Sequence, residues 1–547
     1  MRAVTHPTPA PAAEALRGRW LESPGRAFTE AVLQRRLLGV PAQFGIWAWL
    51  LPVLIAVLGG VLRFYRLGEP GSLVFDETYY VKDAYSYLQS GYERDWPDNA
   101  NDSFNAGNPG VLLDTPEYVV HPPVGKWMIA AGMWLFGSDN AFGWRFGAAL
   151  TGTLSILIIA LIAQTLFKST ALGGVAGLLT AIDGHHLVHS RTSLLDIFLM
   201  FWIVAAFGCL LLDRSDGRRR LAAKIARLAG SSGVPHPSRL LYGPWVLWRP
   251  WRLAAGVCLG LAVGTKWSAL AFVAVFGLMC VLWDLSARRA AGITEWVPAG
   301  VLRDGFPAFF TVIPVAALTY LASWTGWLRS DNAYDRNWAA SNPSERWGWL
   351  PDWLRSLAEY HRSAYAFHNG LHSEHPYESN AWTWLFMGRP TSFYYHSEEA
   401  GHGACHAVNR CSEAVTVVGN PLIWWAAAAS LLVLLFCWAG RRDWRAGAIL
   451  AGVAAGYLPW FLYPERTTFF FYAISFQPFL VLGLTYTLGL ALGRPTDPPW
   501  RRRQGVLVVG LFVAAALLVS AFFLPVWTAE LIDYNQWRWR MWMPSWI

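Results

Sequence analysis

Residues 142–166 read FGWRFGAALTGTLSILIIALIAQTL, and Arg145, near the start, is the one charged residue in this stretch. A helix needs roughly 20 mainly apolar residues to cross the bilayer's hydrocarbon core of about 30 Å. The stretch therefore predicts a membrane-spanning helix. Comparable apolar blocks recur along the chain, and together they decide the fold class.

The composition supports this interpretation. Of 547 residues, 54% are hydrophobic and 15% are charged, whereas soluble domains carry about 25% charged residues. A soluble core cannot use so many apolar blocks of this length, so we predict an all-α polytopic membrane protein. We place eleven spans, at residues 46–62, 142–166, 170–184, 193–212, 251–265, 268–285, 306–323, 419–438, 446–462, 467–491 and 505–524.

The basic residues predict the topology. Segment 213–252 carries nine Lys or Arg against two Asp, and the formal net charge of the chain is +8. Because the positive charge lies in short segments between apolar blocks, it fits the positive-inside rule rather than binding of nucleic acid. The later inner segments are basic too, at Arg288, Arg289, Arg303, Arg441, Arg442, Arg445, Arg494, Arg501, Arg502 and Arg503.

This topology predicts a plasma-membrane protein with a cytoplasmic N-terminus and an extracytoplasmic C-terminus. Residues 127–137, WMIAAGMWLFG, are apolar but too short to span, so we expect a helix in the outer interface. The expected organisation is a cytoplasmic tail (1–45), a catalytic transmembrane module (46–323) with an outer loop (63–141), a second outer loop (324–418), C-terminal helices (419–524) and an outer tail (525–547).

Two of the six cysteines, Cys405 and Cys411, lie together in the second outer loop. Their spacing makes a disulfide feasible, and a disulfide would place this loop in an oxidising compartment. The alternative is a pair of free thiols in the loop.

Ionisable residues collect at the predicted outer ends of the spans. Asp76 and Glu77 open the segment DETYYVKDAYSYL, in which Asp76, Tyr80, Asp83 and Tyr87 recur at helical spacing. Charged groups at membrane depth are costly and point to function. The others are His121, Lys126, Arg145, His185, His186, His189, Arg191, Asp196, Lys266, Glu465 and Arg466.

Cations at the boundary between lipid and water suit the phosphate of a lipid, and a nearby carboxylate suits proton transfer. Each residue also has a structural interpretation. A lone Arg145 or Lys266 can extend to lipid headgroups, and the Asp76–Glu77 pair can be a solvated helix start. The histidines can be structural hydrogen-bonding groups. A His/Glu metal site is possible, but no tight ligand spacing demands one.

At this point the motifs resemble a known family. The Asp76–Glu77 pair, HPPVGKW (121–127), WRFGAAL (144–150), RTSLLDIFLMFW (191–202) and GTKWSAL (264–270) are similar, in this order, to the protein O-mannosyltransferases. These are C-type membrane glycosyltransferases. The second outer loop is too short for the β-trefoil domain of the eukaryotic members, so the resemblance is to the bacterial, actinobacterial type.

The resemblance implies that mannose passes from polyprenyl-phosphate mannose to Ser or Thr hydroxyls of secreted or membrane proteins, at the extracytoplasmic face and with inversion. It also implies that Asp76 is the catalytic base, that Glu77 supports it or orients the acceptor, and that Arg145 holds the donor phosphate. Weaker carry-overs as contacts to the phosphate or the sugar are Lys126, Lys266, Arg466, His121 and Arg191. Beyond the lipid-linked donor, no cofactor or metal is required.

The expected partners are the donor, a Ser/Thr-rich acceptor polypeptide, membrane lipids and, by the resemblance, the secretion channel. One alternative keeps the fold but uses a lipid or a cell-wall polysaccharide as acceptor. Another is a transporter. Transporters often show two related halves and sites at the midplane, whereas this sequence shows no such repeat and its charges gather at one face.

Overall fold

The computed structural model describes residues 28–40, 44–110, 112–230 and 233–547. Arg2, Arg17, Arg19 and Arg26 of the predicted N-terminal tail lie outside the described residues. The chain forms two compact units. The smaller one comprises Met1–Pro41, Arg214–Arg249 and Val281–Pro307, and the larger one comprises Ala42–Asp213, Pro250–Cys280 and Ala308–Ile547.

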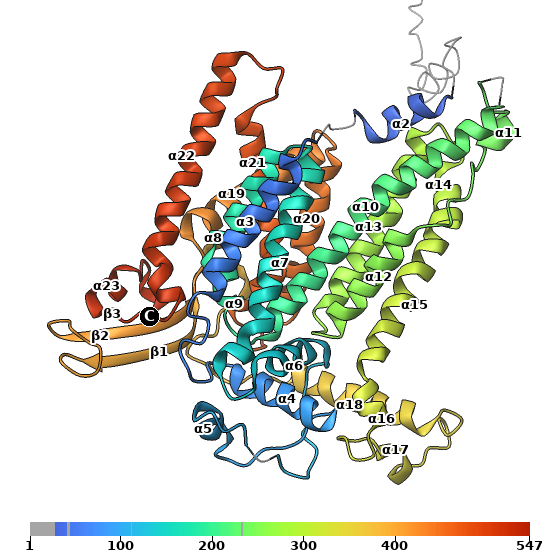
Figure 1. Ribbon diagram of the computed structural model, residues 1–547. Coiled ribbons are helices and arrows are strands. Elements are labelled where there is room, and N and C mark those ends of the chain that lie inside the picture. Colours follow the sequence, from blue (N-terminus) through green and yellow to red (C-terminus); the bar gives the residue numbers. More distant parts are fainter. Residues whose placement is uncertain (1–27, 41–43, 111, 231–232) are drawn as a thin grey trace, which may run out of the picture. The chain divides into compact units, whose positions relative to one another are not determined.

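Helices dominate both units (Figure 1). The first half of the chain contains α2 (Glu30–Leu38), α3 (Trp47–Phe64), α4 (Glu77–Ser90), α5 (Ala100–Asn105), α6 (Val124–Phe136), α7 (Ala141–Phe167), α8 (Thr170–Ile182), α9 (Gly184–His189), α10 (Leu195–Ala229), α11 (Pro237–Leu240), α12 (Pro250–Val263) and α13 (Ala269–Ala290). The second half contains α14 (Trp296–Gly300), α15 (Phe306–Ser323), α16 (Thr325–Arg329), α17 (Trp338–Ser341), α18 (Asp352–Asn369), α19 (Pro421–Ala439), α20 (Trp444–Tyr457), α21 (Gln477–Leu492), α22 (Pro499–Phe523) and α23 (Tyr534–Trp539).

Shorter helical turns complete the chain. They are the π-helix η2 (Val301–Gly305) and the 3₁₀-helices η3 (Ala381–Phe386), η4 (Leu458–Leu462), η5 (Phe470–Ser475), η6 (Leu524–Trp527) and η7 (Pro544–Trp546).

The prediction of a helical, multi-pass membrane protein is confirmed. Among the described residues, eight helical stretches are long and apolar enough to cross a membrane. They lie at eight of the eleven predicted positions. The other three positions hold the shorter apolar helices α8, α12 and α21, of 13, 14 and 16 residues, so the number of eleven spans stays a prediction. The eight stretches are Trp47–Phe64, Ala141–Phe167, Leu195–Ala229, Ala269–Ala290, Trp296–Ser323, Pro421–Ala439, Trp444–Leu462 and Pro499–Trp527.

Two helices differ in length from the predicted spans. The span expected at 467–491 begins at Gln477, because Thr467 and Thr468 instead donate hydroxyl hydrogen bonds to the carbonyls of Ser373 (2.6 Å) and Ser379 (2.8 Å). The span expected at 193–212 continues as α10 to Ala229. This basic extension is rich in residues that favour helices.

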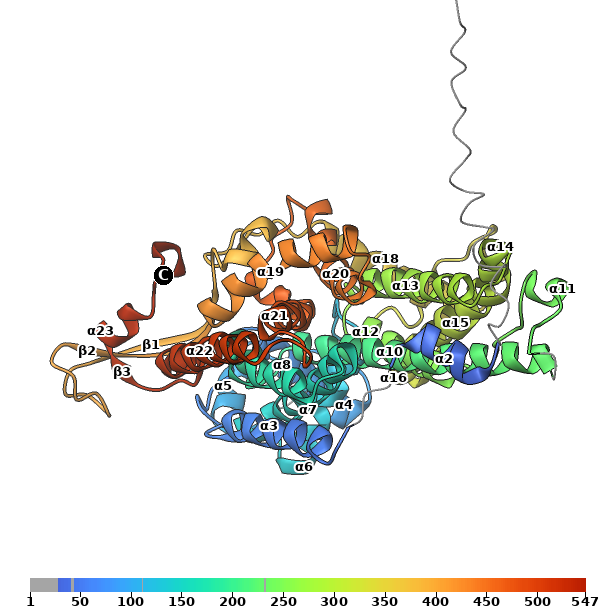
Figure 2. The same ribbon diagram turned by 90° about the horizontal axis from the view of Figure 1, so that it is seen from above.

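Helix α7 is central to the larger unit, where it packs against α3, α6 and α8 (Figures 1 and 2). Its contact with α6 requires glycine. A Cβ at Gly132 of α6 would lie 2.6 Å from the Gly143 carbonyl, and a Cβ at Gly147 would clash with the Met128 carbonyl. The two backbones are therefore closer than larger residues permit, which fixes the HPPVGK segment at the start of α6.

Helix α18 packs next to the segment that precedes α6 in the larger unit. Its buried face, with Leu357 and Tyr360, packs in an aromatic cluster with Trp324 and Trp327. The Tyr360 hydroxyl donates to the Val119 carbonyl at 2.8 Å. Helix α18 is thereby tied to the chain just before the HPPVGK motif.

The segment predicted as the second outer loop (324–418) contains more structure than we expected. Besides α16–α18 it forms a β-hairpin of β1 (Thr391–Glu399) and β2 (Arg410–Val417), with a bulge between Ser392 and Tyr394. The short strand β3 (Ile532–Asp533) pairs with β2, which gives an antiparallel sheet in the order β1-β2-β3. The expectation of an all-α chain therefore misses one small sheet.

The predicted disulfide joins the hairpin connection to β2, since Cys405 and Cys411 are bonded with their Cα atoms 5.6 Å apart. We expect both thiols to resist alkylation in the native, unreduced protein and to react after reduction, as counted by intact mass. The other four cysteines are Cys209, Cys258, Cys280 and Cys437, so a variant lacking these four is the suitable background. Labelling of both loop cysteines without reductant would contradict the prediction.

Candidate functional site

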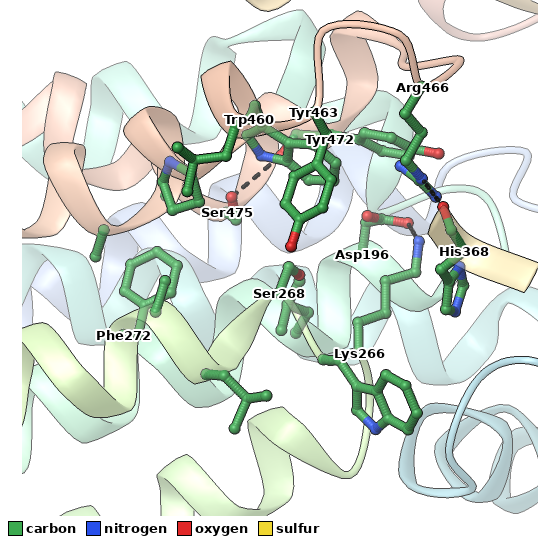
Figure 3. Close-up of a pocket in the computed structure, with 18 of the residues that line it drawn as sticks. Asp196, Lys266, Ser268, Phe272, His368, Trp460, Tyr463, Arg466, Tyr472 and Ser475 are labelled. Carbon is green, nitrogen blue, oxygen red and sulfur yellow. Dashed lines mark hydrogen bonds and ion pairs between the residues drawn. The ribbon is translucent and has the colours of Figure 1, made fainter. Parts of the chain in front are cut away.

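A cavity of about 330 Å³ lies within the larger unit. Its walls come from the start of α10, the turn between α12 and α13, the end of α18, and the segment from α20 to η5 (Figure 3). One part is apolar, with Leu199, Phe272, Ala455 and Pro459. The polar and aromatic part is lined by His121, Asp196, Lys266, Trp267, Ser268, His368, Trp460, Tyr463, Arg466, Tyr472 and Ser475.

Lys266 and Asp196 form a buried ion pair in the cavity wall. Lys266 Nζ donates to Asp196 Oδ2 at 2.7 Å. Lys266 comes from the GTKWS turn, and Asp196 lies in the first turn of α10, where a carboxylate is favoured by the helix dipole. The ammonium also lies 5.4 Å from the ring centroid of Tyr472. Both charges are thus held in fixed places.

Arg466 presents an unused hydrogen-bond donor. Its Nε donates to the His368 carbonyl at 2.9 Å, and its guanidinium stacks near the ring of Trp460, 5.6 Å from the centroid. Its Nη1 is buried and has no hydrogen-bond partner in the described parts of the chain. Such a group is costly unless an acceptor satisfies it. An oxyanion is a suitable acceptor, because arginine binds phosphate well.

Asp76 is half-buried at the residue before α4. Burial raises the pKa of this carboxyl to about 6, and the negative charge of Asp196 adds to the effect. The charge of Lys266 and a hydrogen bond from Tyr80 act in the opposite direction. At neutral pH the group is therefore mostly ionised, and its pKa is close enough to the working pH for a general base.

The residue before Asp76 is held in an unusual conformation. Phe75 has φ of +48°, in the left-handed region that bulky residues rarely adopt. Its ring stacks on Phe393 of β1 with centroids 4.7 Å apart and meets the edge of Phe471 at 5.4 Å. These aromatic contacts from two distant segments fix the turn that carries Asp76.

Glu77 and Arg145 form a second buried ion pair. Arg145 donates to both carboxylate oxygens of Glu77 at 2.8 Å and to the carbonyls of Leu67, Pro70 and Ser72. These five bonds use all five N–H groups of a guanidinium. Glu77 also accepts from the backbone N–H groups of Val74 and Ser193. Both side chains are fully buried.

Comparison with known proteins supports the sequence resemblance. Residues 53–230 match the family model "Dolichyl-phosphate-mannose-protein mannosyltransferase", and residues 353–546 match "C-terminal four TMM region of protein-O-mannosyltransferase". A polyprenol-phosphate-mannose–protein mannosyltransferase of Mycolicibacterium smegmatis is 39% identical over 523 residues, which cover 92% of this chain and 95% of that protein. The chain belongs to the polyprenol-phosphate-mannose–protein mannosyltransferase family.

Other members agree with this assignment. The Mycobacterium tuberculosis mannosyltransferase is 38% identical, with 92% of this chain and 94% of that protein covered. The solved Saccharomyces cerevisiae protein O-mannosyltransferase Pmt1-Pmt2 complex, bound to its sugar donor, matches in fold with a TM-score of 0.67 at 16% identity. That match covers 96% of this chain and 95% of the other. The predicted C-type glycosyltransferase fold is therefore confirmed.

In this mannosyltransferase family member, the predicted site residues fall into two groups. Lys266, Arg466 and His121 line the cavity, and the charge of Lys266 reaches Asp76. The imidazole of His121 lies 5.0 Å from that of His368, and burial keeps its pKa well below the usual value, so it is neutral. The second group, which comprises Asp76, Glu77, Lys126, Arg145 and Arg191, is not part of the cavity lining.

Lys126 is fully buried in its own charge cluster. It pairs with Glu93, lies 3.7 Å from Asp83 and donates to the His121 carbonyl at 2.9 Å. It therefore holds the HPPVGK segment against α4.

Arg191 binds carbonyl groups at the end of α3. It donates to the carbonyl of Arg63 (2.9 Å), in the last turn of α3, and to those of Tyr65 (2.5 Å) and Arg66 (2.9 Å), just after it. His186, from the neighbouring turn, contacts Arg63 Nη2 at 2.8 Å and Ser155 Oγ at 2.9 Å. Arg191 and His186 therefore bind groups of the protein at the end of α3. Among the described residues no group of three or more His, Cys, Asp or Glu is placed to hold a metal ion.

Some site residues were missed by sequence reasoning. His368 and Tyr365 come from α18, whose amphipathic pattern indicates a helix but not which residues reach a cavity. The aromatic residues Trp460 and Tyr472 belong to runs that indicate packing or lipid contact. The sequence marks Asp196 as a charge at the start of a predicted span but indicates no role for it.

Proposed function

We propose that this protein transfers mannose from polyprenyl-phosphate mannose to a Ser or Thr hydroxyl of a protein acceptor. One observation carries the proposal. A single cavity combines an apolar part, an unused buried donor on Arg466, and a fixed Lys266 close to the ionised carboxylate of Asp76. This combination suits a lipid-linked phosphosugar beside a base, and relatives of the chain are named for this reaction.

In this proposal the donor phosphate binds to Arg466 Nη1, and Lys266 supplies a second positive charge. The polyprenyl chain lies along Leu199, Phe272 and Ala455. As the bond between the sugar and the phosphate breaks, negative charge grows on the leaving phosphate. Fixed cations stabilise that charge more in the transition state than in the ground state.

Asp76 acts as the general base. The acceptor oxygen attacks C1 of mannose, its proton moves to the Asp76 carboxylate, and polyprenyl phosphate leaves with the electron pair of the broken C1–O bond. Asp76 then releases the proton to water. A single displacement inverts the configuration at C1. A hydroxyl is a poor nucleophile until its proton is removed, which is why a positioned base is needed.

For Glu77 and Arg145 we propose a positioning role. Every donor of Arg145 is used within the protein, so the phosphate contact expected from the resemblance would require breaking buried bonds. The pair instead fixes residues 67–77, which carry Asp76. For Glu77, this positioning role agrees with one role that the resemblance implies, which is to support the base Asp76.

The cellular setting is part of the proposal. The basic inner segments favour a plasma-membrane protein with the N-terminus in the cytoplasm and the site at the extracytoplasmic face. An acceptor met there is a secreted or membrane polypeptide, which makes association with the secretion channel reasonable.

The function is tested with purified protein in nanodiscs, supplied with radiolabelled polyprenyl-phosphate mannose and a Ser/Thr/Pro-rich peptide. Label on the peptide, lost on mild alkaline β-elimination, supports the proposal. Transfer to an added lipid or polysaccharide but not to any peptide would refute the protein acceptor, and no transfer despite donor binding would refute the reaction.

Arg466→Ala is expected to raise the KM for the donor about 10- to 100-fold, because a charge-assisted hydrogen bond to phosphate contributes about 1.5–3 kcal/mol. The KM for the peptide should change less than threefold. Arg362→Ala is the matched control, since Arg362 is exposed and pairs with Glu359 on the outer face of α18. An unchanged donor KM in Arg466→Ala would remove Arg466 from the phosphate site.

A further inference from the structure

We propose that Asp196 selects the sugar by accepting hydrogen bonds from hydroxyl groups of the donor's hexose. This inference rests on the proposed function and concerns the same cavity. It assigns to Asp196 a task separate from binding phosphate and from proton transfer.

The charge of Asp196 is the first reason. The cavity is proposed to receive an anionic phosphodiester, and a carboxylate in its wall opposes that binding, since like charges at close range are unfavourable. Asp196 is 2% exposed and pairs with Lys266, so it weakens the attraction of Lys266 for the phosphate. A site for the phosphate alone is better served by an uncharged residue here. The carboxylate therefore points to a neutral, hydroxyl-bearing part of the ligand.

The hydrogen bonding of Asp196 is the second reason. Lys266 Nζ is bonded to Oδ2. In the described parts of the chain no hydrogen bond is found to Oδ1, although Asp196 lines the cavity. A carboxylate has about four acceptor positions, so several remain for hydroxyl donors. The ion pair holds the carboxylate rigidly, which reduces the entropy cost of recognition.

The surroundings are the third reason. Figure 3 shows the rings of Trp460, Tyr463 and Tyr472 on one side of the cavity, opposite Ser268 and near the Asp196–Lys266 pair. Aromatic faces contact the apolar C–H face of a pyranose, while a carboxylate and hydroxyls bind its rim. With the phosphate at Arg466, this part of the cavity is left for the sugar.

A site built to bind a hydroxyl rejects an analogue that lacks it, because its buried polar group is then left unpaired. The test uses polyprenyl-phosphate mannose and its four monodeoxy analogues, lacking the C2, C3, C4 or C6 hydroxyl. With the unmutated protein we expect at least one analogue to lose about 10- to 100-fold in kcat/KM, as a charged hydrogen bond would. In Asp196→Asn the same analogue should differ from mannose by less than about threefold.

A counter-ion role gives a different pattern. If Asp196 merely holds Lys266, then Asp196→Asn and Lys266→Met should lower kcat/KM for all five donors by the same factor. Unchanged ratios between the donors would overturn the inference. The inference would also be overturned if the unmutated protein lost no kcat/KM with any of the deoxy donors. This outcome does not depend on whether a variant folds.

Asp213→Asn is the matched control. Asp213 is a buried carboxylate of the same helix, paired with Arg252 at 3.1 Å, and it lies about 25 Å along α10 from Asp196 at 1.5 Å per residue. The Asp213→Asn variant should keep the full loss of kcat/KM with the sensitive deoxy donor. The proposed function fails if the unmutated protein transfers no mannose to peptide, whereas this inference fails if transfer occurs and the donor ratios do not depend on Asp196.

Discussion

Replacing Asp76 with asparagine is expected to lower the turnover of mannose transfer about 10²- to 10⁴-fold, the range that a positioned general base contributes. The substitution preserves the shape of the side chain but removes its capacity to take a proton. Donor affinity should stay within about threefold, because Arg466 and Lys266 remain in place. The measurement is single-turnover transfer to peptide, with equilibrium binding of the donor in parallel.

The pH dependence gives an independent readout. The pKa of Asp76 is raised to about 6, and a general base works in its ionised form. Turnover should therefore rise with pH through about 6 and fall roughly tenfold between pH 7 and pH 5. Asp98→Asn, in the exposed segment before α5, is the control and should keep both the rate and the profile. Substantial turnover in Asp76→Asn, or a flat profile over this range, would exclude Asp76 as the base.

The sequence predicted the helical class and the Asp76–Glu77 pair because both are local signals. An apolar block shows itself without knowledge of its neighbours. Two adjacent carboxylates at a helix start next to a membrane span are equally visible. The lengths of α10 and α21 were less accessible, since α10 ends after a basic extension, and the threonines before α21 bind other segments instead of extending it.

The partners of each charge could not be predicted from the sequence. Arg145 and Lys266 are both single cations at helix ends. Arg145 meets Glu77, 68 positions away, and three carbonyls of a loop, whereas Lys266 meets Asp196 at a cavity. Which of the two faces a ligand depends on how distant segments pack. The hairpin β1–β2 was not predicted for a similar reason. It lies in a polar segment in which apolar and polar residues alternate only weakly.

Glu77→Gln and Arg145→Ala should each cost about 3–5 kcal/mol of unfolding free energy, because either change leaves an unpaired charge in a fully buried place. Arg145→Lys should be little more stable than Arg145→Ala, since an ammonium has three donors and cannot reproduce the five bonds of the guanidinium. Thermal unfolding in a fixed detergent, alongside Arg362→Ala as a surface control, measures the loss.

Activity then distinguishes positioning from direct contact with the donor. If Arg145 positions Asp76, the folded fraction of Arg145→Ala should lose turnover, because the loop that carries the base is no longer fixed, while the donor KM changes less than threefold. If Arg145 binds phosphate, the donor KM should rise as it does for Arg466→Ala. The double variant Glu77→Gln/Arg145→Met removes both charges and should recover part of the stability lost by either single variant. Because Arg145 also satisfies three carbonyls, recovery should be incomplete, and turnover should stay low since the position of Asp76 depends on the same contacts.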